Sequence, residues 1–303
     1  MTSYGFVHLE FGDQHRERSL QVLDKLRIRL AQDGDRFSSV IVDNASATPA
    51  ESATGTNSAQ GLVVTGDNSN REFSGWDTGV ETLLARGEQP DVWIFSNDTV
   101  ALNHAWSERR LERFGGEIRK LALHPGPWLF GEINDFPRST MTPMGPLLEW
   151  VSTYCFAMNN TLRHRLGTLS PGNALLDSLV NEQFEPGRGV FRDHVGEAYV
   201  DFVSAWLISD DGEGEQKRRR FKWDHEWHKA SPLGAENFED LRMKARCCLS
   251  EHMLSLRARQ AGADIRSPYD ARNLREHVRR SLQFLSDKLW EKFLLRRLRL
   301  ERS

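Results

Sequence analysis

FSSVIVDN, residues 37–44, joins a run of apolar and β-branched residues to an aspartate and an asparagine. A short apolar run of this kind predicts a strand that is buried on both faces. Similar runs occur at residues 4–9, 61–65 and 91–95, and segments with helical spacing separate them at residues 14–32 and 76–86. Buried strands that alternate with helices indicate parallel βαβ units, so the sequence predicts an α/β fold.

Polar residues follow two of these predicted strands. Asp43-Asn44-Ala45-Ser46 comes after one, and Ser96-Asn97-Asp98-Thr99 after another. In open α/β sheets, ligands bind beyond the carboxyl ends of the strands, where the strand order reverses. Both polar segments are therefore candidates for a binding site.

The composition is that of a folded protein. The chain has 303 residues, of which 39% are hydrophobic and 27% charged, with a formal net charge of −3. This balance argues against disorder and against a general nucleic-acid binder. The three cysteines, Cys155, Cys247 and Cys248, lack the spacing of a metal site. No apolar run approaches the ~20 residues of a membrane span, and no basic flank precedes an apolar stretch at the start, so we expect a cytoplasmic protein.

The second half has a different pattern. We expect a long strand at residues 148–158, a short helix at 161–166, and a helix at 238–261 that ends at Gly262. Residues 45–60 and 209–220 have the composition of loops.

The last segment is basic, with ten Lys or Arg and four Asp or Glu between residues 272 and 302. Its apolar residues recur at helical spacing, which predicts an amphipathic helix, and they are Leu274, Val278, Leu282, Leu285, Leu289 and Phe293. This face suits packing on the rest of the chain, a homodimer with a second copy, or peripheral contact with an anionic membrane.

Four segments in order resemble the motifs of GT-A glycosyltransferases, in particular the family-two enzymes of bacterial surface polysaccharide synthesis, such as rhamnosyltransferases. Residues 41–46 resemble the I-V-D-N-x-S pattern, and residues 70–79 loosely match a glycine-rich segment that precedes a helix. Residues 95–99 (FSNDT) resemble the metal motif L-N-x-D-T. Residues 250–265 align without a gap with E-D-x-D-L-S-x-R-L-x-x-x-G-x-x-I.

The resemblance implies a mostly parallel GT-A sheet flanked by helices and a role for each matched residue. Asp43 would bind the nucleotide base, Asp98 would hold Mg²⁺ or Mn²⁺ at the diphosphate, and Glu251 would be the general base. Further residues in the matched segments are expected at the nucleotide, and they are Asn44, Ser46, Asn70, Gly75, Trp76 and Asn97. Trp76 fits a core position equally well.

The sequence departs from these motifs at three places. Ser96 stands where the metal motif has its first acid or amide. The Glu-Asp pair of the last motif is Ser250-Glu251, and its third acid is Met253. The missing acids at Ser96 and Met253 favour an alternative function in which the protein binds its ligand without catalysis.

The expected organisation is a catalytic domain over residues 1–266 and a basic helical tail over 267–303. Within the domain, residues 1–165 form the nucleotide-sugar half and residues 166–266 the acceptor half. The resemblance implies transfer of a sugar from a nucleotide-diphosphate donor to a glycan or lipid-linked glycan hydroxyl, with inversion of the anomeric configuration, for lipopolysaccharide or a similar polymer. The alternative is a non-catalytic protein that binds a nucleotide sugar or scaffolds a polysaccharide complex. On either hypothesis we expect no nucleic-acid partner and a location in the cytoplasm or at the inner face of the membrane.

Overall fold

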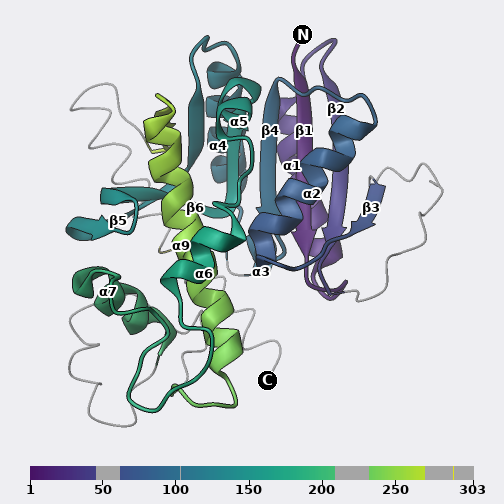
Figure 1. The fold of residues 1–303 in the computed structure, drawn as a ribbon. Coiled ribbons are helices and arrows are strands. Elements are labelled where there is room, and N and C mark those ends of the chain that lie inside the picture. The colour runs from purple at the N-terminus through teal and green to yellow at the C-terminus, as the bar shows by residue number, and fades with distance from the viewer. Residues whose placement is uncertain (46–61, 103, 209–231, 270–288, 290–303) are drawn as a thin grey trace.

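The computed structural model describes residues 1–45, 62–102, 104–208, 232–269 and 289, which form an α/β structure around one mixed sheet (Figure 1). Within these residues the sheet has seven strands, in the order β3-β2-β1-β4-β6-β5-β7. Their bounds are Ser3–Glu10 (β1), Arg36–Asp43 (β2), Leu62–Thr65 (β3), Val92–Asn97 (β4), Trp128–Thr142 (β5), Gly145–Asn159 (β6) and Asp264–Arg266 (β7).

The first four strands are parallel, as the βαβ pattern predicts. The expectation of a mostly parallel sheet is nevertheless too simple, because β6 runs antiparallel to both of its neighbours, β4 and β5. The reason is local. β5 and β6 are joined by a tight turn at residues 142–145, and a turn this short can connect only antiparallel strands.

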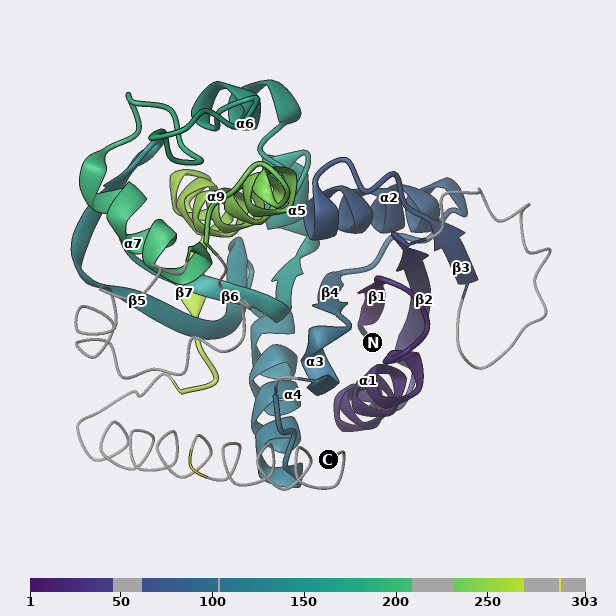
Figure 2. The same ribbon diagram turned by 90° about the horizontal axis from the view of Figure 1, so that it is seen from below.

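Helices cover both faces of the sheet (Figure 2). One face carries α1 (Arg16–Leu30), α3 (Thr99–Leu102) and α4 (Glu108–Ala122). The other carries α2 (Arg71–Ala85), α5 (Asn160–Leu166) and α9 (Phe238–Gln260). Two further helices, α6 (Asn173–Leu179) and α7 (Glu197–Leu207), lie beside α9 on this second face.

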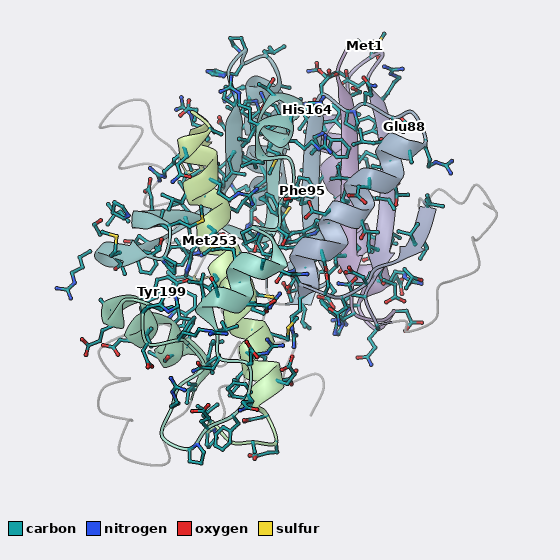
Figure 3. The ribbon with its side chains drawn as sticks, viewed as in Figure 1. Met1, Glu88, Phe95, His164, Tyr199 and Met253 are labelled. Carbon is teal, nitrogen blue, oxygen red and sulfur yellow. The ribbon has the colours of Figure 1, made fainter. Side chains whose placement is uncertain are left out.

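Alternate residues of the parallel strands supply separate cores on the two faces. Val7 and Leu9 of β1 pack beneath α2, whereas Tyr4 and Phe6 pack beneath α1 and α4. Phe95 on β4 belongs to the α2 side and lies near the middle of the molecule (Figure 3). A third cluster joins α7 to α9 and includes Tyr199 and Met253.

Several predicted elements are confirmed. The strands at 4–9, 37–42, 61–65, 91–95 and 148–158 appear with shifts of a few residues, and so do the helices at 14–32, 161–166 and 238–261. Gly262 has φ 76° directly after α9, the left-handed conformation expected of a helix-ending glycine. The pattern did not predict α3, α4, α6, α7, β5 or β7.

Some predictions fall outside the described residues. These are the role of Ser46, the loop assignments over most of 45–60 and 209–220, and nearly all of the basic tail. In the part of the chain that is described, no helix is both long and apolar enough to cross a membrane.

Asp77 of α2 fastens the connection between α5 and α6 to the sheet's helical layer. Its carboxylate accepts the backbone N–H groups of Leu169 and Ser170 at 2.7 and 3.0 Å. Arg257 of α9 donates to the carbonyl oxygens of Leu166, Thr168 and Leu169 from the other side. Burial raises the pKa of Asp77 to about 6, against the pull of these hydrogen bonds and of Arg257.

We expect Asp77→Asn to change how stability depends on pH. Because the folded state binds this proton more tightly than an unfolded chain, wild-type stability should fall as pH rises from about 4 to about 6. The full effect would be up to about 3 kcal/mol. Urea unfolding across this range should show a shallower fall in the variant. Asp24→Asn, on the exposed face of α1, should retain the wild-type slope, and an unchanged slope in Asp77→Asn would contradict the assignment.

Candidate functional site

The strand order reverses at β1, since β2 and β3 lie on one side of it and β4 on the other. Such a switch point is where α/β sheets bind ligands. The carboxyl ends of β1, β2 and β4 face the viewer in Figure 2. Glu10 ends β1, Asp43 ends β2 directly opposite Glu10, and Asp98 follows β4. Glu10 pairs with Asp43 and Leu9 pairs with Asn97, so the strand register brings Glu10, Asp43 and Asp98 to one edge of the sheet. Burial is the largest cause that raises the pKa of Glu10, and the charges of Asp43 and Asp98 raise it further.

Asp43 is held by the loop that follows its own strand. Its Oδ1 accepts the backbone N–H of Ala45 at 2.8 Å and that of Gly12 at 3.3 Å. The side chain is partly exposed at the edge of the sheet. The loop after β1 and the loop after β2 are thereby joined through one carboxylate, which lies where the sequence predicts a base-binding acid.

Asp98 and Thr99 are the partly exposed members of their motif. Burial raises the pKa of the Asp98 carboxyl, hydrogen bonds from the backbone of Phe11 and Thr99 oppose this, and the charge of Glu72 raises it further. Ser96 is buried, and its hydroxyl lies 2.9 Å from Nδ1 of the buried His8. Asn97 is also buried, and its Oδ1 accepts the hydroxyl of Thr99 at 2.6 Å. Of these neighbouring motif residues, Asp98 therefore presents its carboxylate to the edge.

Glu10 and Arg16 form a pair at the site that the sequence did not single out. The side chain of Glu10 is fully buried, and both of its carboxylate oxygens accept Nε of Arg16, at 3.0 and 2.8 Å. Arg16 is partly exposed at the start of α1. A charged residue closing an apolar strand was the available signal, but in sequence it resembles an ordinary turn residue.

Asn44 and Asn70 brace the start of α2. Asn44 Nδ2 donates to the carbonyl oxygen of Arg71 at 2.8 Å. Asn70 Nδ2 donates to the hydroxyls of Ser170 and Ser250 at 3.0 and 3.1 Å. Arg71 has φ 45°, an unfavourable conformation for a residue with a Cβ, so these contacts hold a strained segment in place. Both asparagines are buried, and their amide nitrogens bond to the protein.

Gly75 and Trp76 lie inside α2, because that helix begins at Arg71 and not at residue 76. A Cβ on Gly75 would approach Leu9 Cδ1 to 1.9 Å, so this glycine lets α2 pack closely on β1. Trp76 is fully buried, and its Nε1 donates to the carbonyl oxygen of Ser96 at 3.0 Å. The structure therefore places Trp76 in the core, the second of its two expected positions.

Glu251 lies on α9 with its carboxylate directed at β6. Trp150 Nε1 donates to Oε1 at 2.7 Å, and the Thr153 hydroxyl donates to Oε2 at 2.5 Å. Burial raises the pKa of Glu251, while these two donors lower it. The carboxyl is therefore a stronger base than one in water, and its charged form is stabilised by the two donors.

Glu72, in the first turn of α2, connects the two parts of the site. Its charge raises the pKa of both Asp98 and Glu251, so it lies within electrostatic reach of each. Its Oε2 accepts the thiol of Cys247 at 3.1 Å, which joins α2 to α9. Sequence analysis missed Glu72 because acids are common in the first turn of any helix.

The described residues offer a divalent cation one partly exposed carboxylate, that of Asp98, and no complete ligand set. No group of three or more His, Cys, Asp or Glu side chains in the described residues is arranged to hold a metal ion. Mg²⁺, however, is commonly held by one or two carboxylates together with substrate phosphates. Asp98 is partly exposed and suits such a role, whereas Ser96 is turned into the core.

Comparisons with known proteins assign no role to these residues. No family model matches the sequence, and no curated protein matches it either.

Proposed function

We propose that the protein is an inverting glycosyltransferase with a GT-A-like fold. It would transfer a sugar from a nucleoside-diphosphate donor to a glycan hydroxyl in bacterial surface polysaccharide synthesis. The observation that supports this most is the placement of Asp43, Asp98 and Glu251. They come from three distant parts of the chain, yet the strand register brings Asp43 and Asp98 to one sheet edge. Glu72 of α2 accepts the thiol of Cys247 on α9, the helix that carries Glu251, and its charge raises the pKa of both Asp98 and Glu251.

The donor would bind across the carboxyl ends of β1, β2 and β4. Asp43 is partly exposed at the sheet edge and would accept a hydrogen bond from the nucleotide base. Asn44 and Asn70 would contribute indirectly, because their hydrogen bonds fix the start of α2. When bound at Asp98, Mg²⁺ or Mn²⁺ would stabilise the negative charge that develops on the departing diphosphate.

The acceptor would bind between α2 and α9, beside Glu251. Glu251 would remove the proton from the acceptor hydroxyl as its oxygen attacks the anomeric carbon. The bond from that carbon to the donor phosphate would break, and the nucleoside diphosphate would leave with the bonding electron pair. A single displacement of this kind inverts the anomeric configuration.

Nucleotide binding is the direct test of this proposal. In a thermal-shift screen of UDP, GDP, dTDP and CMP, one diphosphate with Mn²⁺ should stabilise the protein, by about 2.7 kcal/mol at a concentration one hundred times its Kd. Asp98→Asn should abolish the part of the shift that depends on Mn²⁺, because the cation loses its carboxylate. Asp24→Asn, an exposed acid on α1, should retain it.

The other outcomes of this screen are equally informative. Stabilisation of equal size without Mn²⁺ would remove Asp98 as a metal ligand while keeping the nucleotide site. No response to any nucleotide would contradict a nucleotide-sugar transferase.

A non-catalytic protein that binds a nucleotide sugar is the second candidate. Two observations favour it: the Ser96 hydroxyl bonds to buried His8, and Met253 packs in the core where the family motif has an acid. Donor turnover separates the candidates, because transferases commonly hydrolyse their donor slowly without acceptor, whereas a binding protein leaves it intact. The peripheral membrane contact expected of the basic tail concerns residues that lie almost entirely outside the described part of the chain.

A further inference from the structure

Both carboxylate oxygens of Glu251 on α9 accept hydrogen bonds from the neighbouring strand β6. Each of its carboxylate oxygens accepts a short hydrogen bond from a different residue of β6: Trp150 Nε1 to Oε1 at 2.7 Å and Thr153 Oγ1 to Oε2 at 2.5 Å. The backbone N–H of Thr153 approaches Oε2 as well, at 3.4 Å. Trp150 and Thr153 are themselves buried, with 1% and 6% of their surface exposed.

These donors are rigid. Trp150 is surrounded by aromatic rings, including Phe136 at 4.7 Å and His252 at 4.5 Å between ring centroids. Thr153 lies within β6, where a β-branched side chain has few rotamers. The adjacent contact between α9 and β6 is also fixed, because Ser255 Oγ accepts the N–H of Val151 at 2.9 Å. The carboxylate of Glu251 therefore has one orientation imposed by the sheet.

We propose that Thr153 is the positioning residue of Glu251, with Trp150 as its partner. The two donors together fix the direction in which the carboxylate presents its remaining lone pairs to an acceptor hydroxyl. This inference rests on the proposed function for its catalytic meaning, although the contacts themselves do not depend on it.

The other titratable groups around Glu251 either raise its pKa or are themselves uncharged at neutral pH. Glu72 of α2 faces it with a like charge that raises its pKa. Cys248 of the same helix and Tyr199 of α7 both have a raised pKa and are uncharged at neutral pH. His252 is buried with its pKa lowered to about 3, so it too carries no charge. Among these neighbours, Thr153 and Trp150 are the donors that stabilise the ionised carboxylate.

The test is the pH titration of the Glu251 carboxyl, monitored by carbon-detected NMR. The Glu251→Gln variant identifies which resonance belongs to this carboxyl. Thr153→Val keeps the shape and removes the hydroxyl donor, so the pKa of Glu251 should rise by about one unit, a tenfold change in proton affinity. Thr153→Ser keeps a hydroxyl and should restore the wild-type titration. Ser255→Ala loosens the same helix–strand contact without touching Glu251 and should leave the titration unchanged.

Three results would overturn the proposal: an unchanged titration in Thr153→Val, the same displacement in Thr153→Ser, or an equal displacement in Ser255→Ala. Failure of the proposed function would look different. If Glu251→Gln retained full donor turnover while Thr153→Val still raised the pKa of Glu251, the positioning contact would stand and the role of Glu251 as general base would fall. If donor turnover is measurable, the acidic limb of its pH profile should move upward in Thr153→Val together with the NMR titration.

Discussion

Replacing Glu251 by glutamine is expected to lower turnover by about 10² to 10⁴-fold, the usual contribution of a general base. Glutamine is the same size and can still accept a hydrogen bond from Trp150 or Thr153, but it cannot take a proton from an acceptor hydroxyl. Donor affinity should change little, because the nucleotide would bind at the carboxyl ends of β1, β2 and β4. Release of nucleoside diphosphate from the donor that the thermal-shift screen identifies would measure the turnover.

The pH dependence of wild-type turnover should also show that Glu251 acts as a base. Burial raises the pKa of Glu251, so the fraction of ionised base decreases at a higher pH than it would for an exposed glutamate. Activity should therefore decline on the acidic side, and Glu251→Gln should lack this decline. An equal loss of donor affinity and turnover in the variant would instead mean that Glu251 has an architectural role.

Replacing Glu132 by alanine is expected to destabilise the fold by about 3–5 kcal/mol, the effect of leaving a buried charge without its partner. Glu132 on β5 pairs with Arg110 of α4 at 2.7 Å, and each side chain is only 4% exposed. The hydroxyl of Tyr154 on β6 donates to the same carboxylate oxygen at 2.7 Å. Removal of the carboxylate would leave the Arg110 guanidinium in a region that excludes water.

Urea unfolding measures this loss, and Glu108→Ala is the matched control. Glu108 also pairs with cations, Lys25 and Arg29, but it lies on the exposed surface, where ion pairs contribute little. The control should unfold close to the wild type. Equal stability of Glu132→Ala and Glu108→Ala would show that water or another group reaches Arg110 when its partner is removed.

The parallel half of the fold was predictable because its signals are local. β1, β2, β3 and β4 are short apolar runs, and α1 and α9 show their buried faces as leucines at helical spacing. The antiparallel half was less visible. β5 is a 15-residue strand with irregular register against β6, which blurs its alternation, and β7 has only three residues. The α4 helix is capped by Ser107, whose side chain accepts the N–H of Arg110, a capping signal that the sequence did contain.

The sequence by itself determined the α/β class, the polar ends of β2 and β4, and the helix that carries Glu251. Each of these depends on residues that are neighbours in the chain, where period and turn chemistry are legible. Only the tertiary structure decided which polar residues are exposed at the sheet edge and which are buried. It turned Ser96 toward His8 and placed Trp76 in the core, and it used Asn44 and Asn70 as braces. It also brought Glu10, Glu72 and Thr153 to the site, because burial and charge at one point depend on side chains that are distant in sequence.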